Sequence, residues 1–144
     1  MFVLATTMSA CAANSDKTTD TEANGELQIQ ENESMNKEQT NTYRQIGMEE
    51  AVIMMREESD YIILDVRRAD EFAAGHIPNA INVSNEDIGT NEIPELLDKN
   101  QLIMVYCRSG RRSKEAAEKL VKLGYTNIVE FGGILDWKGE IVTD

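Results

Sequence analysis

The sequence contains few residues of the kinds that build metal centres and disulfide frameworks. Its 144 residues include one histidine and two cysteines. One histidine excludes a histidine-cluster metal site, and two cysteines can form neither a four-cysteine zinc site nor a set of disulfides. We therefore expect no metal, and the sequence gives no sign of an organic cofactor either. The two cysteines, Cys11 and Cys107, need separate explanations.

Basic residues are also in the minority. The chain carries 14 lysines and arginines against 26 aspartates and glutamates, which gives a formal net charge of −12. Nucleic acids and anionic membrane surfaces attract basic patches, so neither is expected as the main partner. The length suits one domain of ordinary size and hardly two.

The first part of the chain has almost no large apolar residues once its opening run ends. Residues 1–10 are apolar and small, Cys11 follows at once, and residues 12–42 are rich in Asn, Thr, Glu, Ser and Gln. A segment of that composition buries too little apolar surface to offset its chain entropy. We therefore predict a disordered polar tether over 12–42 and a folded domain over 43–144.

The segment Met8-Ser9-Ala10-Cys11 resembles the end of a bacterial lipoprotein signal peptide, in which the cysteine carries the lipid. The resemblance implies that 1–11 is a truncated lipoprotein signal segment and that Cys11 is lipidated. It also implies a bacterial protein anchored to the cell membrane outside the cytoplasm. The alternative is an incidental cysteine at a frayed N-terminus of a cytoplasmic protein. The apolar run is too short for a transmembrane helix under either interpretation.

Strands and helices alternate in the predicted domain, and its strongest strands are apolar throughout. That combination indicates an α/β domain with a parallel sheet covered on both faces, whose ligands gather at the carboxyl ends of the strands. We predict helices over Met48–Ser59, Ile93–Lys99 and Ser113–Gly124, a short helical turn before Gly75, and a final turn or helix over Gly132–Trp137. We predict strands over Tyr43–Ile46, Tyr61–Val66, Ala80–Val83, Leu102–Cys107 and Asn127–Phe131.

The loop after Cys107 combines a thiol with positive charge. It leads from a buried strand into a helix, whose N-terminus favours ionisation of a thiol. First helical turns normally prefer acids, but here the loop and turn carry Arg108, Arg111, Arg112 and Lys114. We interpret the segment as a nucleophile beside an anion site; the alternative is a structural cysteine followed by a solvated basic loop.

Three segments resemble the rhodanese family of sulfurtransferases in order and spacing: Leu64–Val83, Val105–Ser113 and Phe131–Trp137. The resemblance covers essentially the whole of the predicted domain, 43–144, which is therefore similar to a single-domain rhodanese. It implies a rhodanese-like α/β fold, with a five-stranded parallel sheet and helices on both faces. It also implies that Cys107 cycles through a persulfide.

Loop length separates this family from its relatives that act on phosphate. Rhodaneses have six residues from the cysteine to the closing arginine, as in Cys107 to Arg112 here, whereas the related dual-specificity phosphatases have seven. The position that the longer loop would require to be arginine is Ser113. The count favours sulfur transfer over phosphoryl transfer.

The resemblance suggests roles for the loop residues. The Cys107 thiolate attacks the outer sulfur of a donor such as thiosulfate, and the persulfide then passes that sulfur to cyanide or a thiol. The loop amides, from Ser109 through Gly110 to Arg112, would stabilise the anionic sulfur. Arg108 and Arg111 are expected to face solvent and attract the anionic donor, while Arg112 braces the loop.

Asp65 and Arg67 follow the other strong strand, and two interpretations of them stay open. In two-domain rhodaneses the arginine of this motif helps to bind the donor, which would make Arg67 a binding residue supported by Asp65. Alternatively, the two form a structural charge pair that braces the end of the sheet. His76 and Trp137 are expected to be structural.

Three classes of function remain open. The first is a monomeric thiosulfate sulfurtransferase that takes a small anionic sulfur donor and a thiol or cyanide acceptor. The second is a persulfide carrier or sulfide-handling protein with little small-molecule turnover. The third is a non-catalytic binding module, which the intact Cys107 disfavours. A dithiol oxidoreductase is disfavoured because no second cysteine lies near Cys107 in the sequence.

Overall fold

The computed structural model describes residues 42–90 and 92–144. The predicted signal segment, the lipidation site Cys11 and almost all of the predicted tether lie outside these residues. None of the helices in the described ranges is long and apolar enough to cross a membrane.

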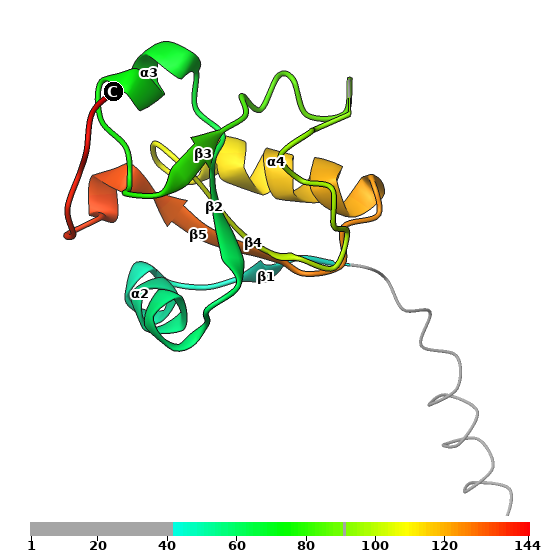
Figure 1. The fold of residues 1–144 in the computed structure, drawn as a ribbon, viewed down its shortest axis with the longest axis horizontal. Helices are drawn as coiled ribbons and strands as arrows, with labels where there is room; N and C mark the ends of the chain where they lie inside the picture. Colours follow the sequence, from blue (N-terminus) through cyan, green and yellow to red (C-terminus); the bar gives the residue numbers. More distant parts are fainter. Residues whose placement is uncertain (1–41, 91) are drawn as a thin grey trace, which may run out of the picture. The chain divides into compact units, whose positions relative to one another are not determined.

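Five parallel strands form one sheet in the order β1-β5-β4-β2-β3 (Figure 1). The central strand, β4, is buried along its whole length, as its uninterrupted apolar sequence predicts for a sheet covered on both faces. The strands are β1 (Arg44–Gln45), β2 (Tyr61–Asp65), β3 (Ala80–Asn82), β4 (Leu102–Cys107) and β5 (Ile128–Gly133).

Helices cover both faces of this sheet. Helix α2 (Met48–Glu57) lies on one side and α4 (Arg111–Lys122) on the other, while the short α3 (Ala69–Ala73) lies beyond the end of the sheet (Figure 1). A single-turn 3-10 helix, η1 (Ile134–Asp136), follows β5. This arrangement confirms the predicted α/β fold class, a five-stranded parallel sheet with helices on both faces.

Alternation along the central strands divides the core into two clusters. Successive strand residues point to opposite faces, so Val105 and Cys107 of β4 pack with Ala116 of α4. Tyr106, between them in sequence, packs on the other face with Ala51 of α2. The alternation therefore directs the Cys107 side chain toward the helix that follows it.

One predicted helix is wrong. Ile93–Lys99 forms no helix; the segment contains a turn at Pro94–Glu95 and otherwise runs without regular structure. Ile93 and Leu96 are buried, but the Leu96 carbonyl accepts a hydrogen bond from the Tyr125 hydroxyl at 2.5 Å. A stretch of this length gains too few internal hydrogen bonds to offset helix nucleation, and tertiary contacts decide its path instead.

The helix after the cysteine starts earlier than predicted. Helix α4 begins at Arg111, and Gly110 precedes it with a φ of 102°, in the left-handed region that favours glycine. That turn brings the first helical residues directly over the end of β4. The short helical turn predicted before Gly75 is α3, and the other predicted helices and strands form with ends shifted by a few residues.

Candidate active site

Three neighbouring strands, β2, β4 and β5, end at the same edge of the sheet. Their register places Asp65 beside Tyr106 and Cys107 beside Gly133. Polar side chains that are far apart in the sequence therefore meet where ligands gather in parallel sheets. The site is built on these strand ends and on the loop from Cys107 to α4.

The Cys107 thiol lies beneath the loop that follows it. Its residue is 1% exposed, and its sulfur accepts a hydrogen bond from the Gly110 N–H at 3.0 Å. The Ser113 hydroxyl oxygen is 3.5 Å from the same sulfur. Of the loop amides predicted to face an anionic sulfur, Gly110 is the one that bonds to Sγ itself. Ser109, beside it, is exposed.

The end of β5 supports the loop from behind. A Cβ atom on Gly133 would overlap the backbone of Arg108 and Ser109, so only glycine allows this close approach. The Leu135 N–H then donates to the Arg108 carbonyl at 3.2 Å. The glycine pair before Trp137 therefore holds the backbone of the loop in place.

Arg112 closes the loop by pairing with a distant carboxylate. Its two terminal nitrogens donate to Glu71, Nη1 to Oε2 at 2.7 Å and Nη2 to Oε1 at 2.9 Å. These hydrogen bonds hold the pKa of Glu71 at about 2, against an ordinary value of 4.5. The same pair raises the pKa of Arg112. The predicted bracing contact of Arg112 is thus present in the structure, with Glu71 of α3 as the partner.

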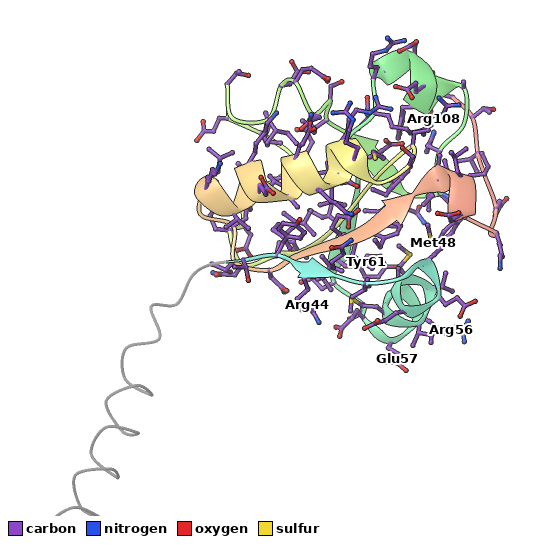
Figure 2. All side chains as sticks on the ribbon, turned by 180° about the vertical axis from the view of Figure 1, so that it is seen from behind. Arg44, Met48, Arg56, Glu57, Tyr61 and Arg108 are labelled. Atoms are coloured by element: carbon purple, nitrogen blue, oxygen red, sulfur yellow. The ribbon has the colours of Figure 1, made fainter. Side chains whose placement is uncertain are left out.

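The remaining cations of the loop differ in what they contact. Arg111 is exposed as predicted, but its Nη1 donates to Glu115 one helical turn later at 2.6 Å. Arg108 is also exposed, and within the described ranges its side chain has no hydrogen bond or ion pair. Figure 2 shows Arg108 at the end of the sheet near α3. Arg108 is therefore the loop arginine with its charge uncommitted.

A cavity of about 640 Å³ opens beside this loop. Four guanidinium groups contribute to its wall, and most of the apolar part of the wall comes from the start of η1. Because the cavity holds more positive than negative side chains, it suits a small anion. Its lining residues are Arg67, Arg68, Glu71, Ala74, Arg108, Arg112, Ile134 and Leu135.

Arg67 is committed to a buried partner even though it reaches the cavity wall. Its Nη2 donates to Asp65 Oδ2 at 2.6 Å and to the Gly75 carbonyl at 2.7 Å, and its Nε also donates to Asp65. Burial lowers the pKa of Arg67, but the hydrogen bonds to Asp65 and its charge outweigh that effect, so the pKa is raised overall. Burial next to Asp65 likewise raises the pKa of Tyr106. The contacts are those of the structural charge pair, with Arg67 at the edge of the site.

His76 and Trp137 make structural contacts, as predicted. The His76 ring stacks on Phe72 with ring centroids 3.7 Å apart, and its Nδ1 lies 3.0 Å from the Phe72 carbonyl. The Trp137 ring packs against the core cluster on the α2 side of the sheet. Its Nε1 donates to the Glu140 carbonyl at 2.9 Å.

Glu130, which was not among the residues predicted from the sequence, lies fully buried on β5 behind the loop. Its Oε1 accepts hydrogen bonds from the Ser113 hydroxyl at 2.6 Å and from the Gly132 N–H at 2.8 Å. One signal could have identified it: a single acid in the otherwise apolar strand before the glycine pair. A charged residue is rarely buried in a strand unless a polar partner requires it.

Taken together, these groups can perform nucleophilic chemistry on an anion. A thiol receives a backbone N–H at the N-terminal end of a helix, where the potential is positive. An uncommitted arginine and an arginine-lined cavity lie next to it. No group of three or more potential metal ligands among His, Cys, Asp and Glu occurs in the described part of the chain.

Comparisons with known proteins agree with this geometry. A family model described as "Rhodanese-like domain" matches residues 48–140. Thiosulfate sulfurtransferase PspE of Escherichia coli (strain K12) is 34% identical over 73 residues, which cover 51% of this chain and 70% of that protein. Thiosulfate sulfurtransferase GlpE of Coxiella burnetii (strain RSA 331 / Henzerling II) is 34% identical over 97 residues, covering 67% and 88%. A solved structure described as "rhodanese with anions from E. coli" is similar with a TM-score of 0.54 at 31% identity, covering 58% of this chain and 99% of that one.

Proposed function

Because this chain belongs to the rhodanese-like domain family of sulfurtransferases, we propose that it transfers sulfane sulfur through a persulfide on Cys107. The donor is thiosulfate or a similar anion, and the acceptor is cyanide or a thiol. The observation that carries the proposal is the hydrogen bond from the Gly110 N–H to the Cys107 sulfur. It lies at the N-terminus of α4, beside the arginine-lined cavity.

The first half of the reaction loads the cysteine. The Cys107 thiolate attacks the outer sulfur of thiosulfate, a bond forms between the two sulfurs, and the sulfur–sulfur bond of thiosulfate breaks. Sulfite leaves with the electron pair of that bond. Arg108, whose charge is uncommitted, is placed to bind the oxygen atoms of the donor.

The second half returns the enzyme to its starting state. The acceptor, cyanide or a thiolate, attacks the terminal sulfur of the persulfide. The Cys107 sulfur leaves as a thiolate, and thiocyanate or a new persulfide departs. The Gly110 N–H, fixed by the fold, stabilises the anionic sulfur without having to reorganise.

Mass spectrometry of the intact protein after thiosulfate treatment tests the persulfide. We expect the protein to gain one sulfur atom, located at Cys107 by peptide mapping, and to lose it when cyanide is added. The Cys107→Ser variant keeps Cys11 and serves as the control; it should neither gain sulfur nor form thiocyanate. Thiocyanate formation by this variant would contradict the proposal.

A persulfide carrier is the second candidate, and the burial of the Cys107 sulfur supports it. A carrier would exchange sulfur with a partner thiol faster than with free thiosulfate. The two candidates are separated by comparing steady-state thiosulfate:cyanide turnover with the rate of persulfide transfer from a low-molecular-weight thiol persulfide. A thiosulfate rate that matches or exceeds the persulfide rate favours the first.

The N-terminal segment adds a proposal on location, supported by sequence alone. We propose that Cys11 carries lipid and anchors a monomeric domain to the outer side of a bacterial cell membrane. Expression in a bacterium with a labelled fatty acid tests it. Label and membrane association should disappear together in Cys11→Ser, and a wild-type protein without label would contradict the proposal.

A further inference from the structure

A buried hydrogen-bonded chain connects Cys107 with a carboxylate that the mechanism above does not use. The chain runs from the Cys107 sulfur to the Ser113 hydroxyl, over 3.5 Å, and from that hydroxyl to Glu130 Oε1, over 2.6 Å. Ser113 and Glu130 are fully buried and Cys107 is 1% exposed. All three come from different elements, the end of β4, the first turn of α4 and the middle of β5.

The geometry determines which group donates to which. A serine hydroxyl has one proton, and its shortest contact is to Glu130; its contacts to the Gly110 and Gly132 carbonyls are longer, at 3.1 and 3.3 Å. With the Ser113 proton given to Glu130, its oxygen is left to accept from the Cys107 S–H. The resting chain therefore reads thiol to hydroxyl to carboxylate.

Glu130 is also the buried side chain with an unmet hydrogen bond. Its Oε2 is the one buried side-chain oxygen or nitrogen in the described part of the chain without a partner. A carboxylate held in that way costs stability, since a buried polar group normally finds partners for its atoms. Proteins keep such groups at sites where the stored cost serves a function.

We propose that Glu130 is a positioning residue that controls, through Ser113, the pH range over which Cys107 becomes nucleophilic. The three hydrogen-bonded side chains together carry one negative charge, which at rest lies on Glu130. When the protons of these hydrogen bonds shift toward Glu130, the thiol proton passes to the Ser113 oxygen and the serine proton passes to Glu130 Oε1. The charge then lies on the sulfur, with Ser113 donating to it, and no atom is oxidised or reduced.

The physical advantage lies in the burial of the chain. Ionising Cys107 while Glu130 stays charged would place two anions in a region closed to water, which is costly. Moving a single charge from oxygen to sulfur avoids that cost. Glu130 would therefore keep Cys107 a thiol at rest and take its proton when the donor's electrophilic sulfur arrives.

Other titratable groups face these three side chains and influence their charges. Tyr43, before β1, has its pKa raised by burial and by the charges of Glu118 and Glu130. Arg112 faces Cys107 from the loop; its hydrogen bonds to Glu71 are the main cause of its raised pKa, and its electrostatic interaction with Cys107 adds to the rise. Neither Tyr43 nor Arg112 hydrogen-bonds to both Glu130 and the Cys107 sulfur; among the described residues Ser113 makes both contacts.

The test measures the rate at which iodoacetamide alkylates Cys107 as a function of pH, with Cys11→Ser as the background so that one thiol reacts. Glu130→Gln keeps the shape of the side chain and removes its charge. We expect the midpoint of the alkylation profile to move to lower pH by about one unit, because no carboxylate then opposes the thiolate. An unchanged midpoint would overturn the proposal.

Ser113→Ala tests the path. Its midpoint should move to higher pH, because the thiolate loses the hydroxyl that donates to it. Adding Glu130→Gln to Ser113→Ala should then shift the midpoint by less than half of what Glu130→Gln does alone. An equal shift would assign the effect to charge through space and overturn the role of Ser113. Should Glu130→Gln fail to fold, an unshifted Ser113→Ala midpoint overturns the proposal by itself.

Glu118→Gln is the matched control, since it removes an exposed carboxylate from the same helix, α4, and should leave the midpoint unchanged. The proposal rests on the proposed function only in taking Cys107 as the nucleophile. Alkylation requires no sulfur transfer, so the two can fail separately. A protein that shows the shifts but forms no persulfide would retain the proton-sharing chain and lose the sulfurtransferase assignment.

Discussion

Arg112 and Glu71, which are 41 positions apart in the chain, form two parallel hydrogen bonds of 2.7 and 2.9 Å. The pair joins the loop that begins at Cys107 to α3, across the end of the sheet. A paired, planar contact of this kind defines both distance and orientation. It therefore holds the last residue of the loop in one position.

The stability that this pair contributes depends on pH. The pKa of Glu71 is about 2 when folded, against an ordinary 4.5, so the contribution is complete above about pH 4.5 and is lost as the pH falls toward 2. We expect Glu71→Gln to lower the free energy of unfolding by about 1 kcal/mol at pH 7, since the pair is partly exposed. The deficit should shrink between pH 4.5 and 2.

Urea denaturation across that pH range is the measurement, and Glu95→Gln, an exposed carboxylate outside the site, is the control. A deficit of the same size at pH 7 and below pH 2 would assign the loss to packing instead of charge.

Arg108 should contribute to donor binding more than the other exposed loop arginine does. Its charge is uncommitted and lines the cavity, whereas Arg111 is paired with Glu115 and does not line it. We expect Arg108→Ala to raise the KM for thiosulfate about tenfold, which corresponds to losing one hydrogen bond to a charged group. The rise for Arg111→Ala should be smaller.

Steady-state kinetics at low and high salt measure this difference, which should narrow as ions screen the charge. Arg56→Ala provides the matched control, because Arg56 is exposed on α2, well away from Arg108 (Figure 2). Equal KM increases for Arg108→Ala and Arg56→Ala would show that general positive charge, and not this site, attracts the donor.

Asp65 should be needed for folding. Its carboxylate is fully buried and neutralises Arg67, whose side chain is 7% exposed. Asp65→Asn leaves that guanidinium buried without its counter-charge, so we expect a loss of about 3–5 kcal/mol in the free energy of unfolding. Chemical denaturation of this variant beside Asp136→Asn, an exposed aspartate, is the measurement. A loss below 1 kcal/mol, within the range of an ordinary surface change, would contradict the structural role of the pair.

Gly133 should tolerate no side chain. A Cβ there would overlap the backbone of Arg108 and Ser109, so Gly133→Ala has to push the loop away from the end of β5. We expect a loss of about 1–3 kcal/mol, typical of an overpacked site, together with slower alkylation of Cys107. Gly47→Ala is the control, because a Cβ at Gly47 meets nothing within 4 Å, and it should cost less than about 1 kcal/mol. Equal losses for the two variants would contradict the close contact.

The parts of the fold that could be predicted are those with a strong local pattern. The uninterrupted apolar run of β4 predicts a buried strand, and the spacing of the buried residues of α4 predicts a helix. The latter residues include Ala116, Ala117 and Leu120. The segment Ile93–Lys99 lacks such a pattern. Its path depends on the Tyr125 hydroxyl, which binds the Leu96 carbonyl from 29 positions away. Helix propensity, which depends on neighbouring residues, takes no account of a hydrogen-bond partner so far away in the sequence.

The site could be predicted in its chemistry and only partly in its connections. The position of Cys107 between an apolar strand and a basic helical turn was evident from the residues. The residues alone did not show that Arg111 and Arg112 are paired while Arg108 is uncommitted. That difference depends on Glu115 and Glu71, and only the folded chain brings Glu71 to the loop.

By itself, the sequence predicted Cys107 as the nucleophile and determined the length of its loop and the class of fold, because each depends on patterns among residues that are neighbours in the chain. The tertiary structure alone decided which charges are free, which are neutralised and where Glu130 lies. Those properties depend on pairs such as Glu71 with Arg112 and Ser113 with Glu130, which meet only when separate strands end at one edge of the sheet. Full burial strengthens the contact between Ser113 and Glu130, since a charge removed from water depends on the few groups that touch it, whereas the partly exposed pair of Glu71 and Arg112 is still screened by water.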